Sequence, residues 1–354
     1  MRKKRRWLWG IVCVLLLVGL WQAGSLFFPE GEKALRSQVR ETVKERFPEQ
    51  TPRYLQNFGL FYFDLDRGVW EGTARSRQTV VLVHGLDDPG KVWQNLAPEL
   101  VKADFHVWLL NYPNDQPIEA SAGLFFEEMK ELRQFGVGRV SIVAHSMGGL
   151  VARDMLTRPE FAYDRLAKKK QVPEVASLTM VGTPNHGSQM VRLRVFAEVR
   201  DQLARLVEGE ANWLGAILDG AGEAKIDLLP GSRFLTELNA RPHPSGVDQL
   251  VIAGIASPWN ERDIRGWIDN LQLHVSEAGR KQADALGSYM IAMTHGLGDG
   301  LVTVESARLE GVPLQTVDGT HLSMIRNITE GSRRTPPAVP IIVRRLQQVQ
   351  IAQE

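Results

Sequence analysis

The chain of 354 residues contains a single cysteine, Cys13, so it cannot form an intramolecular disulfide. This excludes the small secreted domains that depend on disulfide bonds for their stability. The sequence also lacks an excess of charge, because 42 Lys and Arg residues stand against 41 Asp and Glu residues, and it lacks internal repeats and low-complexity tracts. Such a composition is typical of a folded globular protein, and we expect no nucleic-acid partner.

One segment lacks charge altogether. Residues 7–28 contain no Asp, Glu, Lys or Arg, and they follow five consecutive basic residues at 2–6. As a helix, these 22 residues would span about 33 Å, enough to cross a hydrocarbon core of about 30 Å. The basic flank predicts a cytoplasmic N-terminus and an exported remainder, on the periplasmic side of a bacterial inner membrane. We therefore expect a membrane anchor at 1–28.

The alternative for this segment is a signal peptide, cleaved after the small residues at 23–25 and releasing a soluble protein. The uncharged run is longer than the apolar region of an ordinary signal peptide, which favours the anchor. Cys13 lies in the middle of the run, away from a position where a lipid would be attached.

Beyond the anchor, the pattern predicts a helical stalk or linker at 29–53 and an α/β domain at 54–354. In the stalk, Leu35, Val39, Val43 and Phe47 recur every four residues before Pro48. In the domain, apolar runs alternate with helical stretches, which predicts a mostly parallel sheet flanked by helices. The expected strands are 60–65, 79–83, 106–110, 140–144, 175–181, 250–255 and 314–317. Residues 189–248 break the alternation, and we expect them to form a helical cap inserted over the sheet.

The segment 143–149, VAHSMGG, predicts the nucleophile. Small residues at Ala144 and Gly148 flank Ser146 at two positions' distance, as a very sharp turn requires. Residues 139–144 read as a buried strand and 150–156 as a helix, so the serine stands between the two elements of a nucleophile elbow.

A serine hydroxyl needs a histidine base, which a carboxylate orients. In a sheet of this kind the acid and then the histidine follow the serine along the chain, at the ends of late strands. Asp299 stands among glycines after the apolar run 289–293, and His321 follows the expected strand 314–317. The rival acids are Asp263, Asp269, Asp284 and Asp318. The rival base is His295, which precedes Asp299 and would break the chain order, whereas we expect His106, His243 and His274 to be structural or solvated.

The reaction also needs two backbone N–H groups to bind the developing oxyanion. The residue after the nucleophile, Met147, supplies one of them. We expect Leu86 to supply the other, because it follows the strand 79–83 in the sequence HGL, where Gly85 permits a close approach.

Taken together, five motifs resemble the α/β-hydrolase superfamily: VLVHGLDD, AHSMGG, GTPNHGS, GDGLVTVESA and GTHLSMI. Within it, the chain is similar to the bacterial lipases and esterases and to related families that include GPI-inositol deacylases. The resemblance covers residues 79–328 and implies a Ser146, Asp299, His321 triad with Leu86 and Met147 as the oxyanion hole. Ala144 replaces the usual first glycine of the elbow. GTPNHGS has no assigned chemistry, and we expect His186 to be structural.

We therefore expect a membrane-anchored serine hydrolase that cleaves carboxylic esters through an acyl-enzyme, without a metal or an organic cofactor. The expected partner is an acyl ester or lipid-like substrate. Two alternatives remain open at this point. A thioesterase, amidase or acyltransferase uses the same triad, and a catalytically silent hydrolase fold would serve as a binding module.

Overall fold

The computed structural model describes residues 29–46, 56–64, 68–70, 78–86, 90–190, 222–273, 277–329 and 331–351. The expected anchor at 1–28 lies outside these residues, and so does most of the first half of the expected cap, at 191–221. Among the described helices, none combines the length and the apolar character that crossing a bilayer requires.

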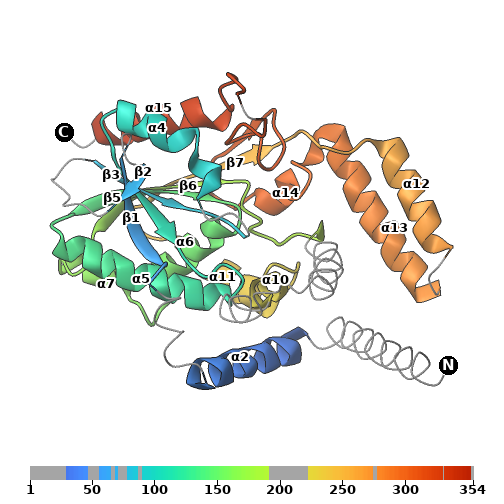
Figure 1. Cartoon of the computed structure of the whole chain (residues 1–354), viewed down its shortest axis with the longest axis horizontal. Helices are drawn as coiled ribbons and strands as arrows, with labels where there is room; N and C mark the ends of the chain where they lie inside the picture. Colours follow the sequence, from blue (N-terminus) through green and yellow to red (C-terminus); the bar gives the residue numbers. More distant parts are fainter. Residues whose placement is uncertain are drawn as a thin grey trace, which may run out of the picture.

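A sheet forms the centre of the described structure (Figure 1). It has eight strands in the order β2-β1-β4-β3-β5-β6-β7-β8. Strand β1 pairs antiparallel with both β2 and β4, and the other pairs, from β4–β3 to β7–β8, are parallel. All seven strands expected from the apolar runs are present, and β2 is an addition. Their bounds are β1 Gly59–Asp64, β2 Gly68–Trp70, β3 Thr79–Val83, β4 His106–Asn111, β5 Arg139–His145, β6 Glu174–Val181, β7 Asp248–Gly254 and β8 Leu314–Val317.

Helices cover both faces of the sheet, as Figure 1 shows. The bounds of all the described helices are α2 Pro29–Arg46, η1 Lys91–Trp93, α4 Leu96–Lys102, α5 Ile118–Gln134, α6 Met147–Thr157, α7 Tyr163–Lys168, α10 Glu223–Asp227, α11 Arg233–Asn239, α12 Glu261–Gln272, α13 Glu277–Ala292, η2 Met293–Leu297, α14 Val304–Ala307 and α15 Ala338–Ile351. Strand residues alternate between two cores, since successive side chains of a strand point to opposite faces. Val81 and Val83 pack with α5 and α6, whereas Val80 and Leu82 pack with α4 and α15.

The described second half of the expected cap region belongs to the main core. Ala224 and Leu228 from the α10 segment are buried with Phe234, Leu235 and Leu238 of α11 in the same cluster as α5 and α6. These residues therefore help to close one face of the sheet.

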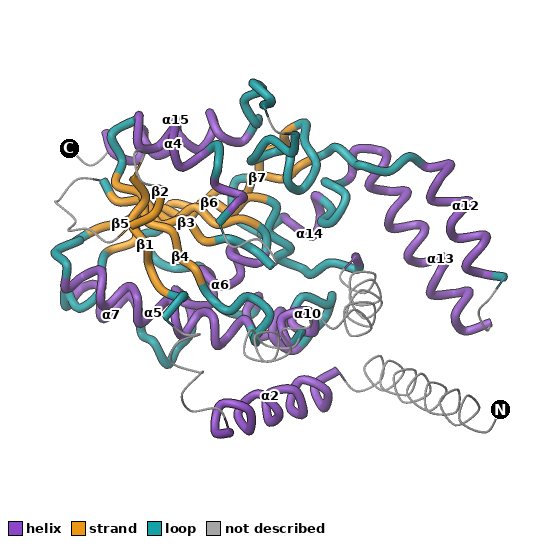
Figure 2. The backbone as a smooth tube through the Cα atoms, viewed as in Figure 1, coloured by secondary structure: helices purple, strands orange, loops and turns teal. Residues whose placement is uncertain are grey.

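A helical hairpin, α12 and α13, extends from the body between β7 and Asp299 (Figure 2). Its two helices pack on each other around a small core that includes Ile264, Ile268, Ala283 and Met290. The sequence pattern did not indicate this hairpin. The run 289–293, which we placed before Asp299 as a late strand end, belongs to α13 and the π-helical turn η2.

Helix α2 forms within the expected stalk, and its basic face makes the contact with the domain. Arg40 forms an ion pair with Glu223, and Lys33 Nζ lies 2.6 Å from Asp227 Oδ1. Leu35 and Val39, half of the apolar stripe seen in the sequence, are 43% and 44% exposed. Charge complementarity with the buried carboxylates of α10 thus decides which side of α2 docks.

Candidate active site

The backbone at Ser146 makes a strained turn between β5 and α6. Ser146 has a φ of 54° and a ψ of −129°, a region that residues with a side chain rarely occupy. A Cβ on Gly148 would overlap the carbonyl oxygens of Val83 and His84, so this position needs glycine. The backbone N–H of Ser146 donates to the carbonyl of Val181 at 2.8 Å, which fixes the turn to β6.

Ser146 is partly exposed at this turn. Although Ser146 occupies the N-cap position of α6, its side chain makes no capping hydrogen bond. The N-terminus of a helix favours negative charge, so the end of α6 is a suitable place for a developing alkoxide or oxyanion.

Asp299 and His321 meet at the same edge of the sheet. His321 Nδ1 donates to Asp299 Oδ2 at 2.8 Å, and both side chains are buried, 7% and 2% exposed respectively. The other carboxylate oxygen, Oδ1, accepts from the backbone N–H groups of Leu301 and Val302 at 2.9 and 2.8 Å. Four strands therefore bring the serine and this pair to one side, because β5, β6, β7 and β8 are neighbours and parallel.

The structure separates the rival residues from His321. Asp263, Asp269, Asp284 and Asp318 are all exposed. His295 is exposed too, and its Nε2 lies 3.1 Å from Glu261 Oε2 on the hairpin. Of the five acids considered in the sequence, Asp299 is the one that contacts His321 within the described residues.

The two expected oxyanion donors lie on segments that adjoin the serine. A Cβ on Gly85, next to Leu86, would lie 2.7 Å from the Cβ of Ser146 and 3.2 Å from its Oγ. Tyr112 holds this segment, since its hydroxyl donates to the carbonyl of His84 at 2.6 Å. The N–H groups of Leu86 and Met147 donate to no other residue in the described part of the chain.

The GTPNHGS segment, to which the sequence assigned no chemistry, supports the candidate site by packing and hydrogen bonds. Gly182 abuts the acid and base, since a Cβ there would lie 3.2 Å from both Asp299 Oδ2 and His321 Cε1. Asn185 is fully buried, accepts from Arg153 of α6 at 3.0 Å and donates to the carbonyl of Ala307 at 2.7 Å. The segment thus joins the helix behind the serine to α14, the short helix that follows the loop of the acid. Among the described residues, the hydrogen bonds of His186 go to Ser306 and Asn239 and not to Ser146, Asp299 or His321.

One residue that contacts the candidate site was not predicted from the sequence, His145. It is the last residue of β5, it is 2% exposed, and its Nε2 lies 3.0 Å from the carbonyl oxygen of His321. Alternation along β5 could have placed it on the same face as Val143. Nothing in the sequence, however, indicates that the backbone of His321 would meet it there.

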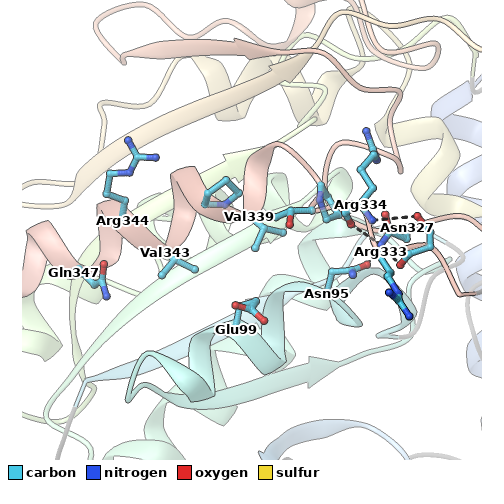
Figure 3. A pocket seen from close by; sticks show the side chains of 13 residues that line it. Asn95, Glu99, Asn327, Arg333, Arg334, Val339, Val343, Arg344 and Gln347 are labelled. Carbon is cyan, nitrogen blue, oxygen red and sulfur yellow. Dashed lines mark hydrogen bonds between the residues drawn. The ribbon is translucent and has the colours of Figure 1, made fainter.

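A groove lies away from these residues. About 570 Å³ in volume, it runs between α4 and the segment 327–347, which includes α15 (Figure 3). Asn95, Asn327 and Arg334 line it, and none of Ser146, Asp299 or His321 does. The described residues contain no group of three or more His, Cys, Asp or Glu side chains that could hold a metal ion.

Comparison with known proteins identifies the family. The profile of the Alpha/beta hydrolase family matches residues 80–330, so the chain belongs to this family. No curated protein matches the chain. The fold is similar to that of the mature lipase BlEst2 from Bacillus licheniformis, with 20% identity, a TM-score of 0.52, and 81% of this chain and 97% of that chain covered.

Two further solved structures share the fold. The metagenomic carboxyl esterase MGS0156 has 19% identity and a TM-score of 0.52 over 81% of this chain and 80% of its own. The Staphylococcus hyicus lipase has 16% identity and a TM-score of 0.50 over 80% and 98% respectively. The chain is accordingly a member of the α/β hydrolase family that shares its fold with these two lipases and this esterase.

Proposed function

We propose that this protein hydrolyses carboxylic esters by a Ser146, His321, Asp299 triad. The observation that carries the proposal is the buried Asp299–His321 hydrogen bond at the sheet edge where the strained turn presents Ser146. One carboxylate oxygen of Asp299 accepts hydrogen bonds from two backbone N–H groups, and the other accepts from His321. These bonds hold the carboxylate in the orientation that lets it accept from the imidazole ring.

In this mechanism the oxygen of Ser146 attacks the acyl carbon while Nε2 of His321 takes the hydroxyl proton. The N–H groups of Leu86 and Met147 bind the oxyanion of the tetrahedral intermediate. His321 then returns the proton to the leaving alcohol oxygen, and the acyl group stays on Ser146. Water attacks this acyl-enzyme with the same assistance from His321, and the released products are a carboxylic acid and the free serine.

A fluorophosphonate probe, which reacts only with an activated serine, tests the proposal on the full-length protein. We expect labelling of wild type and hydrolysis of p-nitrophenyl esters, and we expect Ser146→Ala to lose both with its fold intact. Retention of activity by a folded Ser146→Ala protein would refute the assignment. Absence of labelling in wild type would instead favour a binding module.

A panel of substrates then identifies which class of bond the enzyme cleaves. Short and long p-nitrophenyl esters, a phospholipid, a triglyceride, a thioester and an amide are compared by kcat/KM. We expect esters to be preferred. A higher kcat/KM for the thioester or the amide, or transfer to an added alcohol in place of water, would reassign the enzyme while leaving the triad unchanged.

We also propose that residues 1–28 anchor the enzyme in a membrane with the catalytic domain exported. The uncharged run 7–28 and its basic flank support this location. A reporter that is active only outside the cytoplasm, fused after Glu354, should be active, and the protein should stay in membranes after a high-salt wash. A soluble form beginning near Leu26 would identify a cleaved signal peptide.

A further inference from the structure

Among the residues that the structure describes, three hydrogen bonds hold His321, and they come from two different parts of the molecule. The ring Nδ1 donates to Asp299 Oδ2 at 2.8 Å, and the backbone N–H of His321 donates to the carbonyl of Asp299 at 2.8 Å. Both tie the histidine to the acid loop. The third bond comes from His145, whose Nε2 lies 3.0 Å from the carbonyl oxygen of His321.

His145 lies on a rigid part of the backbone. It ends β5, which pairs with β3 on one side and with β6 on the other, and it directly precedes Ser146 in the chain. Its ring centroid lies 4.8 Å from that of His321 and 6.5 Å from that of the buried Trp93. A displacement of His145 would therefore also displace the backbone of the nucleophile.

The chemistry of the contact fixes the form of the imidazole. A carbonyl oxygen only accepts hydrogen bonds, so Nε2 of His145 carries the hydrogen and donates it. Burial, together with the neighbouring His321, lowers the pKa of His145 to about 3, so its ring is neutral at ordinary pH. A neutral ring does not repel the imidazolium that His321 becomes during the proposed reaction.

We propose that His145 is a positioning residue, which sets the place of His321 relative to Ser146 through its hydrogen bond to the His321 carbonyl. This inference rests on the proposed function. The Asp299–His321 pair is held together by its own two hydrogen bonds, so it stays paired when His145 is replaced. The replacement instead removes the bond that sets the position of this pair relative to the end of β5. A displacement of about 1 Å at a reacting centre lowers the rate on the order of 100-fold.

Two substitutions separate this role from simple core packing. In His145→Gln the side-chain amide places an N–H donor close to the position of Nε2, whereas His145→Met has similar length and fills similar space without a donor. Both are made in the full-length protein in detergent. The measurements are kcat and KM for the best p-nitrophenyl ester, the rate of fluorophosphonate labelling and the melting temperature.

We expect His145→Met to lower kcat and the labelling rate by about 10-fold to 100-fold, with KM within about threefold of wild type. His145→Gln should restore both rates to within about threefold of wild type. Equal rates in the two variants, whether high or low, would overturn the positioning role, because the donor would then make no difference. A rise in KM with kcat unchanged would overturn it too.

Failure of the proposed function gives a different result. A wild-type protein that neither hydrolyses esters nor reacts with the probe would refute the triad, and the positioning role with it. A reactive wild type in which the Gln and Met variants behave alike refutes only the role of His145.

Discussion

The Nδ1 atom of His321 lies 2.8 Å from Oδ2 of Asp299, although the sequence between them contains a strand and the short helix α14. The two residues approach because β8 returns beside β7, next to the loop in which Asp299 stands. The backbone repeats the link, since the N–H of His321 donates to the carbonyl of Asp299 at 2.8 Å. Side chain and main chain thus fix the same pair.

Replacing Asp299 by Asn should lower kcat by about 10⁴-fold, because the amide holds the imidazole of His321 in the wrong tautomer while the geometry is kept. The measurement is kcat for a p-nitrophenyl ester together with the melting temperature. Asp318→Asn is the matched control, since Asp318 is exposed and lies three residues before His321. Near wild-type turnover in Asp299→Asn and its collapse in Asp318→Asn would show that the acid has been misassigned.

Gly85→Ala should lower kcat by more than about tenfold. The new methyl group would lie 2.7 Å from the Cβ of Ser146, so either the serine or the expected oxyanion donor at Leu86 must move. Gly266→Ala is the control, because a Cβ at this exposed position of α12 meets nothing within 4 Å. The control should keep its activity and gain up to about 1 kcal/mol in helix stability. Equal kcat in both variants would contradict the close approach of Gly85.

The parallel sheet could be predicted from sequence because its strands are buried on both faces and appear as continuous apolar runs. Strand β2, of three residues, is too short for such a signal. The run 289–293 misled us for the opposite reason, since a short apolar stretch fits a buried strand and a buried helix equally well. Its neighbours in space, which form the small core of the hairpin, decide in favour of the helix.

The candidate site also contains residues that a local sequence pattern marks and contacts that no such pattern marks. Ser146, Asp299 and His321 could be proposed as site residues because chain order and flanking glycines mark each of them locally. The hydrogen bond of Asn185 to Ala307 and that of His145 to His321 join segments more than 100 residues apart. Such contacts depend on the register of neighbouring strands, which no local pattern specifies.

Arg40→Met should destabilise the protein by about 3 kcal/mol, because it leaves the fully buried carboxylate of Glu223 without its ion-pair partner. Urea unfolding of the full-length protein at fixed pH measures the loss. Lys102→Met is the control, since its pair with Glu99 is exposed and should contribute less than about 1 kcal/mol. Equal losses in the two variants would show that α2 does not depend on its basic face for docking.

Stability should fall in acid partly through His145. Burial and the neighbouring His321 lower its pKa to about 3, and Arg326 and His84 act in the same direction, whereas an unfolded histidine has a pKa near 6.5. The unfolded state therefore binds the proton more readily. Stability from this group is fully present above about pH 6.5 and is lost as the pH falls towards about 3, by up to about 1.4 kcal/mol per pH unit.

The test compares the free energy of urea unfolding between pH 7 and pH 4 in wild type and in His145→Gln, which has no group to protonate. Carboxylates and other histidines titrate in both proteins, so the difference between the two curves isolates His145. We expect the variant to lose less stability than wild type over this range, whatever its stability at pH 7. Parallel curves would mean that His145 has the same pKa in the folded and unfolded states, so that it would become positively charged beside His321 as the pH falls through about 6.5.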